Sequence, residues 1–193
     1  SFRPHEADAS YLIALDSMPK PSPTRQPAND TIKLPGNTVA MLHFGRSGTG
    51  LMHSLIDAHP EISTLPSLYL AGYFNNGVWE HLSQGPVEQL PERFADMFAV
   101  LFDASSLVSV PGALRDGLSQ IGVQEGMTTV GDNRDEILKV DRNLFCSEAR
   151  RLMAGLGNID TGIFLRIVHA AYEHALATKT DRHTLFYHIH NPT

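Results

Sequence analysis

The sequence has little cysteine, no excess of positive charge and no long apolar run. Cys146 is the single cysteine among 193 residues, which excludes an intrachain disulfide and suits a reducing cytosol. Lysine and arginine total 15 against 21 acidic residues, and the net charge of −6 argues against a nucleic-acid partner. No run of about 18 apolar residues predicts a transmembrane helix, and no signal-peptide pattern opens the chain. We therefore expect a cytoplasmic protein without a membrane or nucleic-acid partner.

The composition that is present is typical of a folded domain. Hydrophobic residues make up 42% and charged residues 19% of the chain, as in globular proteins. A chain of 193 residues is long enough for one domain with a core. Prolines at 19, 21 and 23 preclude a helix there. We predict an N-terminal arm or linker over residues 1–30 and one domain over residues 31–193.

Apolar patterns predict an α/β domain. Thr38–Phe44 is a nearly continuous apolar run, typical of a buried parallel strand, and His183–His190 predicts a second strand. Helical periodicity covers residues 49–58, 87–102, 140–156 and 161–178, with a further helix within 111–125 and an irregular segment over 62–85. The charged segment Asp132–Glu136 is interpreted as a turn before a helix, which its Asp or Asn residues cap. This order predicts a helix-rich domain with a central parallel sheet and helices on both sides.

The most informative segment is Gly45–Gly50, a glycine-rich turn between a predicted strand and a predicted helix. Its spacing is that of a nucleotide P-loop, but Leu51 and Met52 stand where that motif continues with Lys and Ser or Thr. An ATPase or kinase of the usual kind is therefore not expected. The helix N-terminus, the Arg46 cation and two hydroxyls still suit a phosphate or phosphosulfate bound without a metal. A glycine turn that only joins a strand to a helix is the alternative.

The segment His43–Pro60, HFGRSGTGLMHSLIDAHP, resembles the 5′-phosphosulfate-binding loop and following helix of sulfotransferases that use 3′-phosphoadenosine 5′-phosphosulfate (PAPS). The family loop carries Lys or Arg, then Ser-Gly-Thr-Thr, and the helix is often followed by His-Pro. Gly50 replaces the second Thr here. The resemblance implies a P-loop-like three-layer α/β/α fold and PAPS as co-substrate. The implied nucleotide-binding residues of the loop are Gly45, Arg46, Ser47, Gly48, Thr49, Gly50 and Leu51.

The last predicted strand resembles a second element of the same family. Sulfotransferases have there a strand that ends in Arg-Asp-Pro or Arg-Asn-Pro, whose Arg binds the 3′-phosphate, and a Ser follows several residues later. In Phe186–Pro192, FYHIHNP, His190 stands in place of this Arg and is only partly cationic near pH 7. The later Ser would fall beyond Thr193, so the resemblance implies a domain that continues past this residue.

The resemblance implies in-line transfer of a sulfuryl group from PAPS to a hydroxyl or amine of an unidentified acceptor, with no metal. Arg46 would bridge the 5′-phosphate and the leaving oxygen, and catalysis would rely on positioning and charge stabilisation. Glu80 and His81 are the leading candidates for the general base, and His53 is a further one. Exposed polar side chains without a role are the alternative interpretation of Glu80 and His81.

Other interpretations are open at this point. A truncated or degenerate domain would bind nucleotide weakly or act as an interaction scaffold, and His190 favours it. A metal-independent nucleotide or phosphate transferase would bind ATP rather than PAPS. His188 and His190 share a strand face, and a position at the edge of the nucleotide or a structural role is favoured for them. They could also bind zinc or copper, with His169 or His183 as a third ligand. An open sheet edge would also favour a homo-oligomer.

Overall fold

The computed structural model describes residues 33–44, 47–57, 59–66, 70, 73–74, 77–107, 121–178 and 182–190. The chain divides into two units, Ser1–Thr31 and Ile32–Thr193, and every described residue belongs to the second. The predicted arm over residues 1–30 therefore lies outside the described residues. The same holds for Gly45, for Arg46 and for residues 111–120 of the helix predicted within 111–125.

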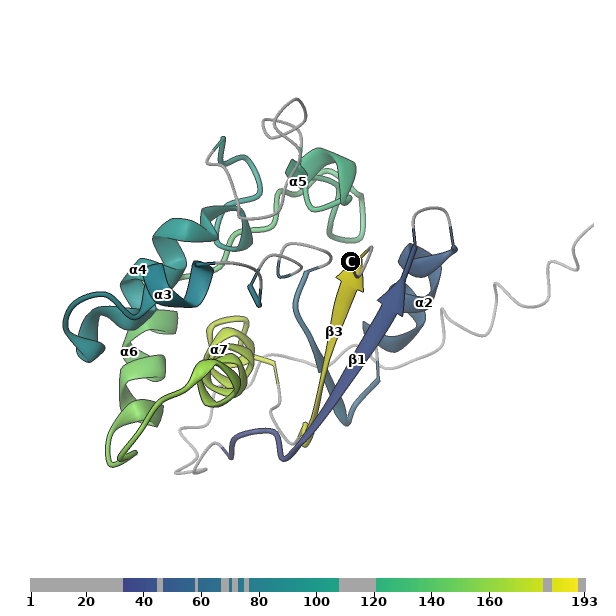
Figure 1. Ribbon diagram of the computed structural model, residues 1–193. Helices are drawn as coiled ribbons and strands as arrows, with labels where there is room; N and C mark the ends of the chain where they lie inside the picture. Colours follow the sequence, from purple (N-terminus) through teal and green to yellow (C-terminus); the bar gives the residue numbers. More distant parts are fainter. Residues whose placement is uncertain are drawn as a thin grey trace, which may run out of the picture. The chain divides into compact units, whose positions relative to one another are not determined.

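Helices and short strands make up most of the described chain (Figure 1). Its strands are β1 (Asn37–His43), β2 (Ile62–Thr64) and β3 (Thr184–His190). Its α-helices are α2 (Thr49–Asp57), α3 (Val78–Leu82), α4 (Leu90–Met97), α5 (Ile121–Gln124), α6 (Arg142–Met153) and α7 (Thr161–Ala175). Two 3₁₀ turns, η2 (Val87–Gln89) and η3 (Ala99–Leu101), flank α4. In this part of the chain, no helix has the length and apolar character needed to span a bilayer.

The three strands form one parallel sheet in the order β1-β3-β2. The central strand β3 buries Leu185 and Phe186, whereas the edge strand β1 is exposed along most of its length. His43 of β1 pairs in register with His190 of β3, so these two strands end side by side. The predicted pair of parallel strands is confirmed, and the mixture of helices with a small parallel sheet agrees with the α/β class. The predicted burial of the first strand is wrong, because β1 lies at the edge of the sheet.

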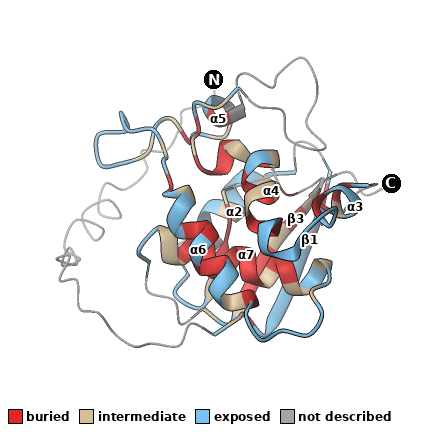
Figure 2. Cartoon of the chain, turned by 90° about the vertical axis from the view of Figure 1, so that its left-hand side faces the viewer, coloured by how far each residue is buried: buried red, intermediate tan, exposed pale blue. Residues whose placement is uncertain are grey.

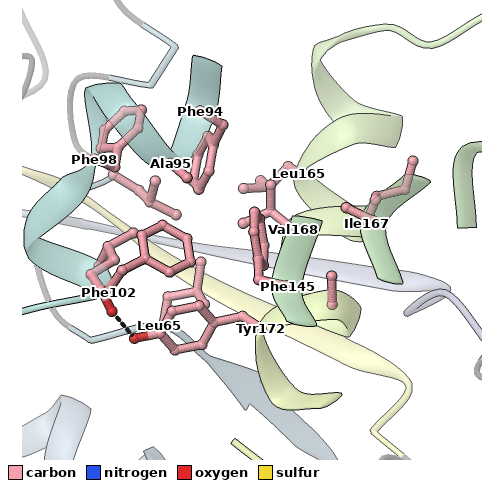
Figure 3. Packing of buried hydrophobic residues seen from close by; sticks show 14 of the residues in the cluster. Leu65, Phe94, Ala95, Phe98, Phe102, Phe145, Leu165, Ile167, Val168 and Tyr172 are labelled. Carbon is pink, nitrogen blue, oxygen red and sulfur yellow. Dashed lines mark hydrogen bonds between the residues drawn. The ribbon is translucent and has the colours of Figure 1, made fainter. Parts of the chain in front are cut away.

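The hydrophobic core lies where α4, α6 and α7 pack together. Figure 3 shows Phe94 of α4 and the following Phe98 close to α7 and to Phe145 of α6, and the ring centroids of Phe94 and Phe145 are 5.9 Å apart. The Tyr172 hydroxyl of α7 donates to the carbonyl of Leu101, 2.5 Å away, which fixes η3 against α7. Buried residues gather on these helices and on β3 (Figure 2). A fully buried aromatic side chain contributes roughly 1.5–3 kcal/mol, so these rings dominate the stability of the domain.

The position of one predicted cap is wrong. Helix α6 is capped by Asp141, whose carboxylate accepts hydrogen bonds from the backbone N–H groups of Asn143 and Leu144. The segment Asp132–Glu136 forms the predicted turn, since backbone hydrogen bonds join Val130 to Glu136 in both directions, but it does not cap α6. These bonds fold the segment back on itself, well before α6 begins.

Two predicted segments also differ from the structure. The helix predicted over residues 87–102 is divided into η2, α4 and η3, because Phe98 adopts a non-helical backbone with φ −112° and ψ 41°. The segment predicted as irregular, residues 62–85, contains β2 and α3. Strand β2 is short and ends in the polar pair Ser63 and Thr64, which are nevertheless buried. Its pairing with β3, rather than an apolar run, defines it as a strand.

Candidate functional site

The glycine-rich segment joins the carboxyl end of β1 to the first turn of α2, as the sequence predicts. Gly48 has φ 76°, a left-handed conformation that glycine adopts without strain. The N–H of Met52 donates to the carbonyl of Gly48 at 3.2 Å and closes the first turn of α2. The N–H groups that precede Met52 in this turn have no acceptor within the helix, and they carry the positive end of its dipole. This end of α2 can therefore bind an anion.

A chain of hydrogen bonds orders the loop from within. The Ser47 hydroxyl donates to the carbonyl of Phe44 at 2.7 Å, and it lies 3.1 Å from the Thr49 hydroxyl. Thr49 Oγ1 lies 3.0 Å from Nδ1 of His43. Each hydroxyl has a single proton, so Thr49 donates to Ser47 and the Nδ1–H of His43 donates to Thr49. The two hydroxyls proposed to meet a phosphate are thus oriented by the last side chain of β1.

Three histidines from three elements meet beneath this loop. Nδ1 of His53, on α2, lies 2.6 Å from Nε2 of His188, on β3. The imidazole centroids are 4.8 Å apart for His53 and His188 and 5.4 Å apart for His43 and His188. His43 and His188 are both buried. Nδ1 of His188 has no hydrogen-bond partner among the residues that the structure describes.

Burial disfavours the charged forms of His53 and His188 in this histidine cluster, which is formed by His43, His53 and His188. Burial, together with smaller contributions from repulsion by His53 and His43, lowers the pKa of His188 to about 4. Burial also lowers the pKa of His53, an effect that the charges of Asp57 and Glu125 oppose. His188 is therefore neutral at pH 7. His188 therefore adds no positive charge for an anion bound at the N-terminus of α2.

Several predicted nucleotide-binding residues are brought together. Gly48, Thr49, Gly50 and Leu51 form the junction between loop and helix, and Leu51 is 69% exposed. A Cβ added at Gly50 would meet nothing within 4 Å, so the surface above this turn is open. The backbone of His190 pairs with His43 at the adjacent strand end. The loop and His190 thus lie at the carboxyl ends of two neighbouring strands.

The two leading candidates for the general base lie elsewhere. Glu80 and His81 are exposed on α3. Figure 1 places α3 and α2 on opposite sides of the β1–β3 pair. The third candidate, His53, belongs to the histidine cluster. The structure therefore brings His53, and neither Glu80 nor His81, to the loop.

Sequence reasoning missed part of this site. The sequence alone presents His43 only as part of a motif, suggests a nucleotide-edge, structural or metal-binding role for His188, and indicates no role for Glu125. The available signal was the position of His43 as the last strand residue before the loop, facing a second strand with histidines at alternate positions. No local pattern could place Glu125 near His53, because this proximity depends on the packing of the intervening chain.

The described side chains do not assemble a metal centre. Within these residues, no group of three or more His, Cys, Asp or Glu is placed to hold a metal ion. His188 uses Nε2 for its hydrogen bond with His53. The side chain of His190, the other half of the possible zinc or copper pair, lies outside what the structure describes.

Comparison with known proteins gives no match: no family model, curated protein or solved structure is significantly similar to this chain.

Proposed function

We propose that this chain is the nucleotide-binding part of a PAPS-dependent sulfotransferase with a P-loop-like three-layer α/β/α fold. The observation that carries the proposal is the loop Gly45–Gly50 between a parallel strand and a helix, beside the end of a second parallel strand. Ligands of open α/β sheets bind at the carboxyl ends of such strands, where helix N-termini supply anion-binding N–H groups. The positions of α2 and α7 on either side of the β1–β3 pair in Figure 1 support the layered arrangement.

In this proposal the nucleotide is held at both phosphates. Backbone N–H groups from Ser47 to Leu51 bind the 5′-phosphate, and Arg46 bridges this phosphate and the oxygen that leaves. His190 faces the 3′-phosphate, and a phosphate dianion beside it would raise the pKa of its imidazole and favour the cation. The acceptor oxygen or nitrogen attacks sulfur, the bond from sulfur to the phosphate oxygen breaks, and adenosine 3′,5′-bisphosphate leaves.

The attacking group must lose a proton, and His53 is the base that the geometry favours. Its pKa is lowered by burial, so it is available as a neutral base near pH 7. Its Nδ1 is fixed by His188, which orients the ring and leaves Nε2 to accept the proton. Glu80 and His81 stay as predictions. Separate alanine variants of the three residues test them, because only loss of the base lowers kcat by the 10²–10⁴-fold typical of acid–base catalysis.

The main test is the Arg46→Ala variant in a transfer assay with ³⁵S-labelled PAPS and a panel of hydroxyl and amine acceptors. We expect no detectable turnover, because the variant loses the cation that stabilises the leaving oxygen. Lys139→Ala is the matched control, since it removes one exposed positive charge, which pairs with Asp103 at 3.9 Å. Activity of Arg46→Ala close to that of the control would contradict the proposal.

A second candidate function is nucleotide binding without catalysis. It is favoured by the low charge of the histidine cluster and by His190 in the place of a permanently charged Arg. In that case the chain binds adenosine 3′,5′-bisphosphate but transfers no sulfate to any acceptor, and the His53→Ala variant binds the nucleotide as the unmodified chain does.

A further inference from the structure

A cavity lies away from the loop, among α3, α4 and the segment that joins α6 to α7. Its volume is about 590 Å³, within the range of small-molecule sites. All of its lining residues are described, and they come from residues 79–93 and 150–159. A Cβ added at Gly155 or Gly157 of its wall would meet nothing within 4 Å, so the hollow continues up to the backbone there. Figure 1 places α3, α4 and α6 on the opposite side of the β1–β3 pair from α2.

One wall of this cavity is apolar and aromatic. Trp79 packs against Phe164 of the core, with ring centroids 6.0 Å apart, and also lines the cavity. Leu156 and Ile159 lie in the same lining, and Leu156 is 40% exposed. A flat indole held by the core, beside exposed aliphatic side chains, suits a flat apolar group of a ligand.

The same cavity is lined by two guanidinium groups. Arg93 donates through Nε to the carbonyl of Leu82 at 2.6 Å and through Nη2 to that of Pro86 at 3.0 Å. No carboxylate pairs with Arg93 among the described residues, so its charge is fixed in place without an acidic partner. Arg150, from α6, pairs with Glu92 of α4. The acidic residue of the lining, Glu88, is exposed, and water screens its charge.

We propose that this cavity is a binding site for a small organic anion that carries a flat apolar group. The carboxylate or sulfate of the ligand lies between Arg93 and Arg150, and its apolar group lies against Trp79. Guanidinium groups bind planar anions in a bidentate manner, and here their own contacts hold them in position before the ligand arrives. The inference does not rest on the nucleotide site, which is formed by other elements.

The single tryptophan of the chain provides a direct test, because its emission reports on this cavity. The whole chain is titrated with 4-nitrophenylacetate, a quenching anion, and with 4-nitrophenylacetamide, its neutral isostere. N-acetyltryptophanamide corrects for collisional quenching. We expect saturable quenching of Trp79 by the anion, with an affinity at least about tenfold higher than that of the amide, because hydrogen bonds to charged groups discriminate on this scale.

Two double variants separate a specific site from general charge effects. Glu92→Gln with Arg150→Gln removes the cavity-lining Arg150 together with its partner, and Asp96→Asn with Arg142→Gln removes a matched pair that also joins α4 to α6. The first should weaken binding of the anion about tenfold, and the second should leave it unchanged. Non-saturable quenching, equal affinity for anion and amide, or equal binding by the two double variants would overturn the proposal.

Discussion

At the scale of single residues, the candidate site depends on how its polar side chains share protons. The hydroxyl of Ser47 donates its proton to the carbonyl of Phe44. Thr49 therefore donates to Ser47, and His43 carries a proton on Nδ1 that it donates to Thr49. His188 is bonded to His53 on one side and buried without a described partner on the other. An arrangement of this kind is sensitive to protonation, because the charged form of a buried imidazole is disfavoured.

Acid should therefore destabilise the fold through His188. Its pKa is lowered to about 4 in the folded state, so between about pH 6.5 and pH 4 the unfolded chain binds more protons than the folded one. Stability is full above pH 6.5 and falls as the pH falls toward 4, with a slope of up to about 1.4 kcal/mol per pH unit. Urea unfolding at pH 7.5 and pH 5.0 measures this loss.

The variant His188→Gln identifies the residue responsible. It has no group that titrates in this range, so the difference in free energy of unfolding between the two pH values should shrink by up to about 2 kcal/mol. Part of the pH dependence should persist, because burial also lowers the pKa of His169, to about 3. An unchanged difference in the variant would show that His188 does not contribute.

The residue types of the loop could be predicted from the sequence, but their hydrogen bonds could not. The spacing of Gly45–Gly50 and its place after an apolar run are local features, and they predicted an anion site at a strand–helix junction. The cluster of His43, His53 and His188 joins positions up to 145 residues apart. Only the pairing of β1 with β3 brings them together, and no local signal encodes that register.

At the scale of elements, two long helices begin with aspartate caps of different strength. Asp141 accepts from two backbone N–H groups of α6, whereas Asp160 accepts from one N–H group of α7, that of Ile163. Asp141→Ala should cost about 1 kcal/mol of unfolding free energy and Asp160→Ala less. Thermal unfolding checks the order, since 1 kcal/mol corresponds to roughly 2–4 °C in Tm for a chain of this size.

Asparagine variants at the same positions are the matched controls. Asn accepts the same hydrogen bonds as Asp, so Asp141→Asn should retain most of the stability. A larger loss from Asp160→Ala than from Asp141→Ala would contradict the prediction.

Long, strongly periodic elements were predicted well because their apolar stripe is itself the cause of their packing. Helices α6 and α7 fall within the predicted residues 140–156 and 161–178. Periodicity alone could not show that Phe98 interrupts the helix of residues 87–102, because α4 and η3 on either side of it both contribute buried apolar residues. Strand β2 was missed since three residues carry no alternation.

At the scale of the whole molecule, the described fold leaves one apolar surface open. It lies on β1, on the loop and on α2, a helix with no buried residue. The exposed side chains of this surface are Val39, Phe44, Leu51, Met52 and Leu55, whereas the exposed Leu42 lies on the opposite face of β1. No charged residue or proline occurs in Asn37–His43, although such residues commonly protect a strand edge. This surface favours self-association, with β1 pairing antiparallel to β1 of a second copy and α2 packing against its twofold mate.

Sedimentation velocity over a range of concentrations tests this association. We expect a concentration-dependent shift from monomer to dimer for the whole chain, because two apolar surfaces leave water when they meet. Leu51→Gln with Leu55→Gln should abolish the shift. Leu107→Gln with Leu176→Gln, two exposed leucines outside the surface, should preserve it. A monomer at every concentration would contradict this prediction.

The central claim concerns the nucleotide, and calorimetric titration of the whole chain tests it most directly. PAPS and adenosine 3′,5′-bisphosphate should each bind at one site, ATP with magnesium should not, and Arg46→Ala should abolish binding of the first two. The affinity should fall with added salt, since the contacts are charged. Binding of ATP alone would indicate a nucleotide or phosphate transferase. Absence of binding by PAPS and adenosine 3′,5′-bisphosphate would contradict the assignment of Gly45–Gly50 as a phosphosulfate-binding loop.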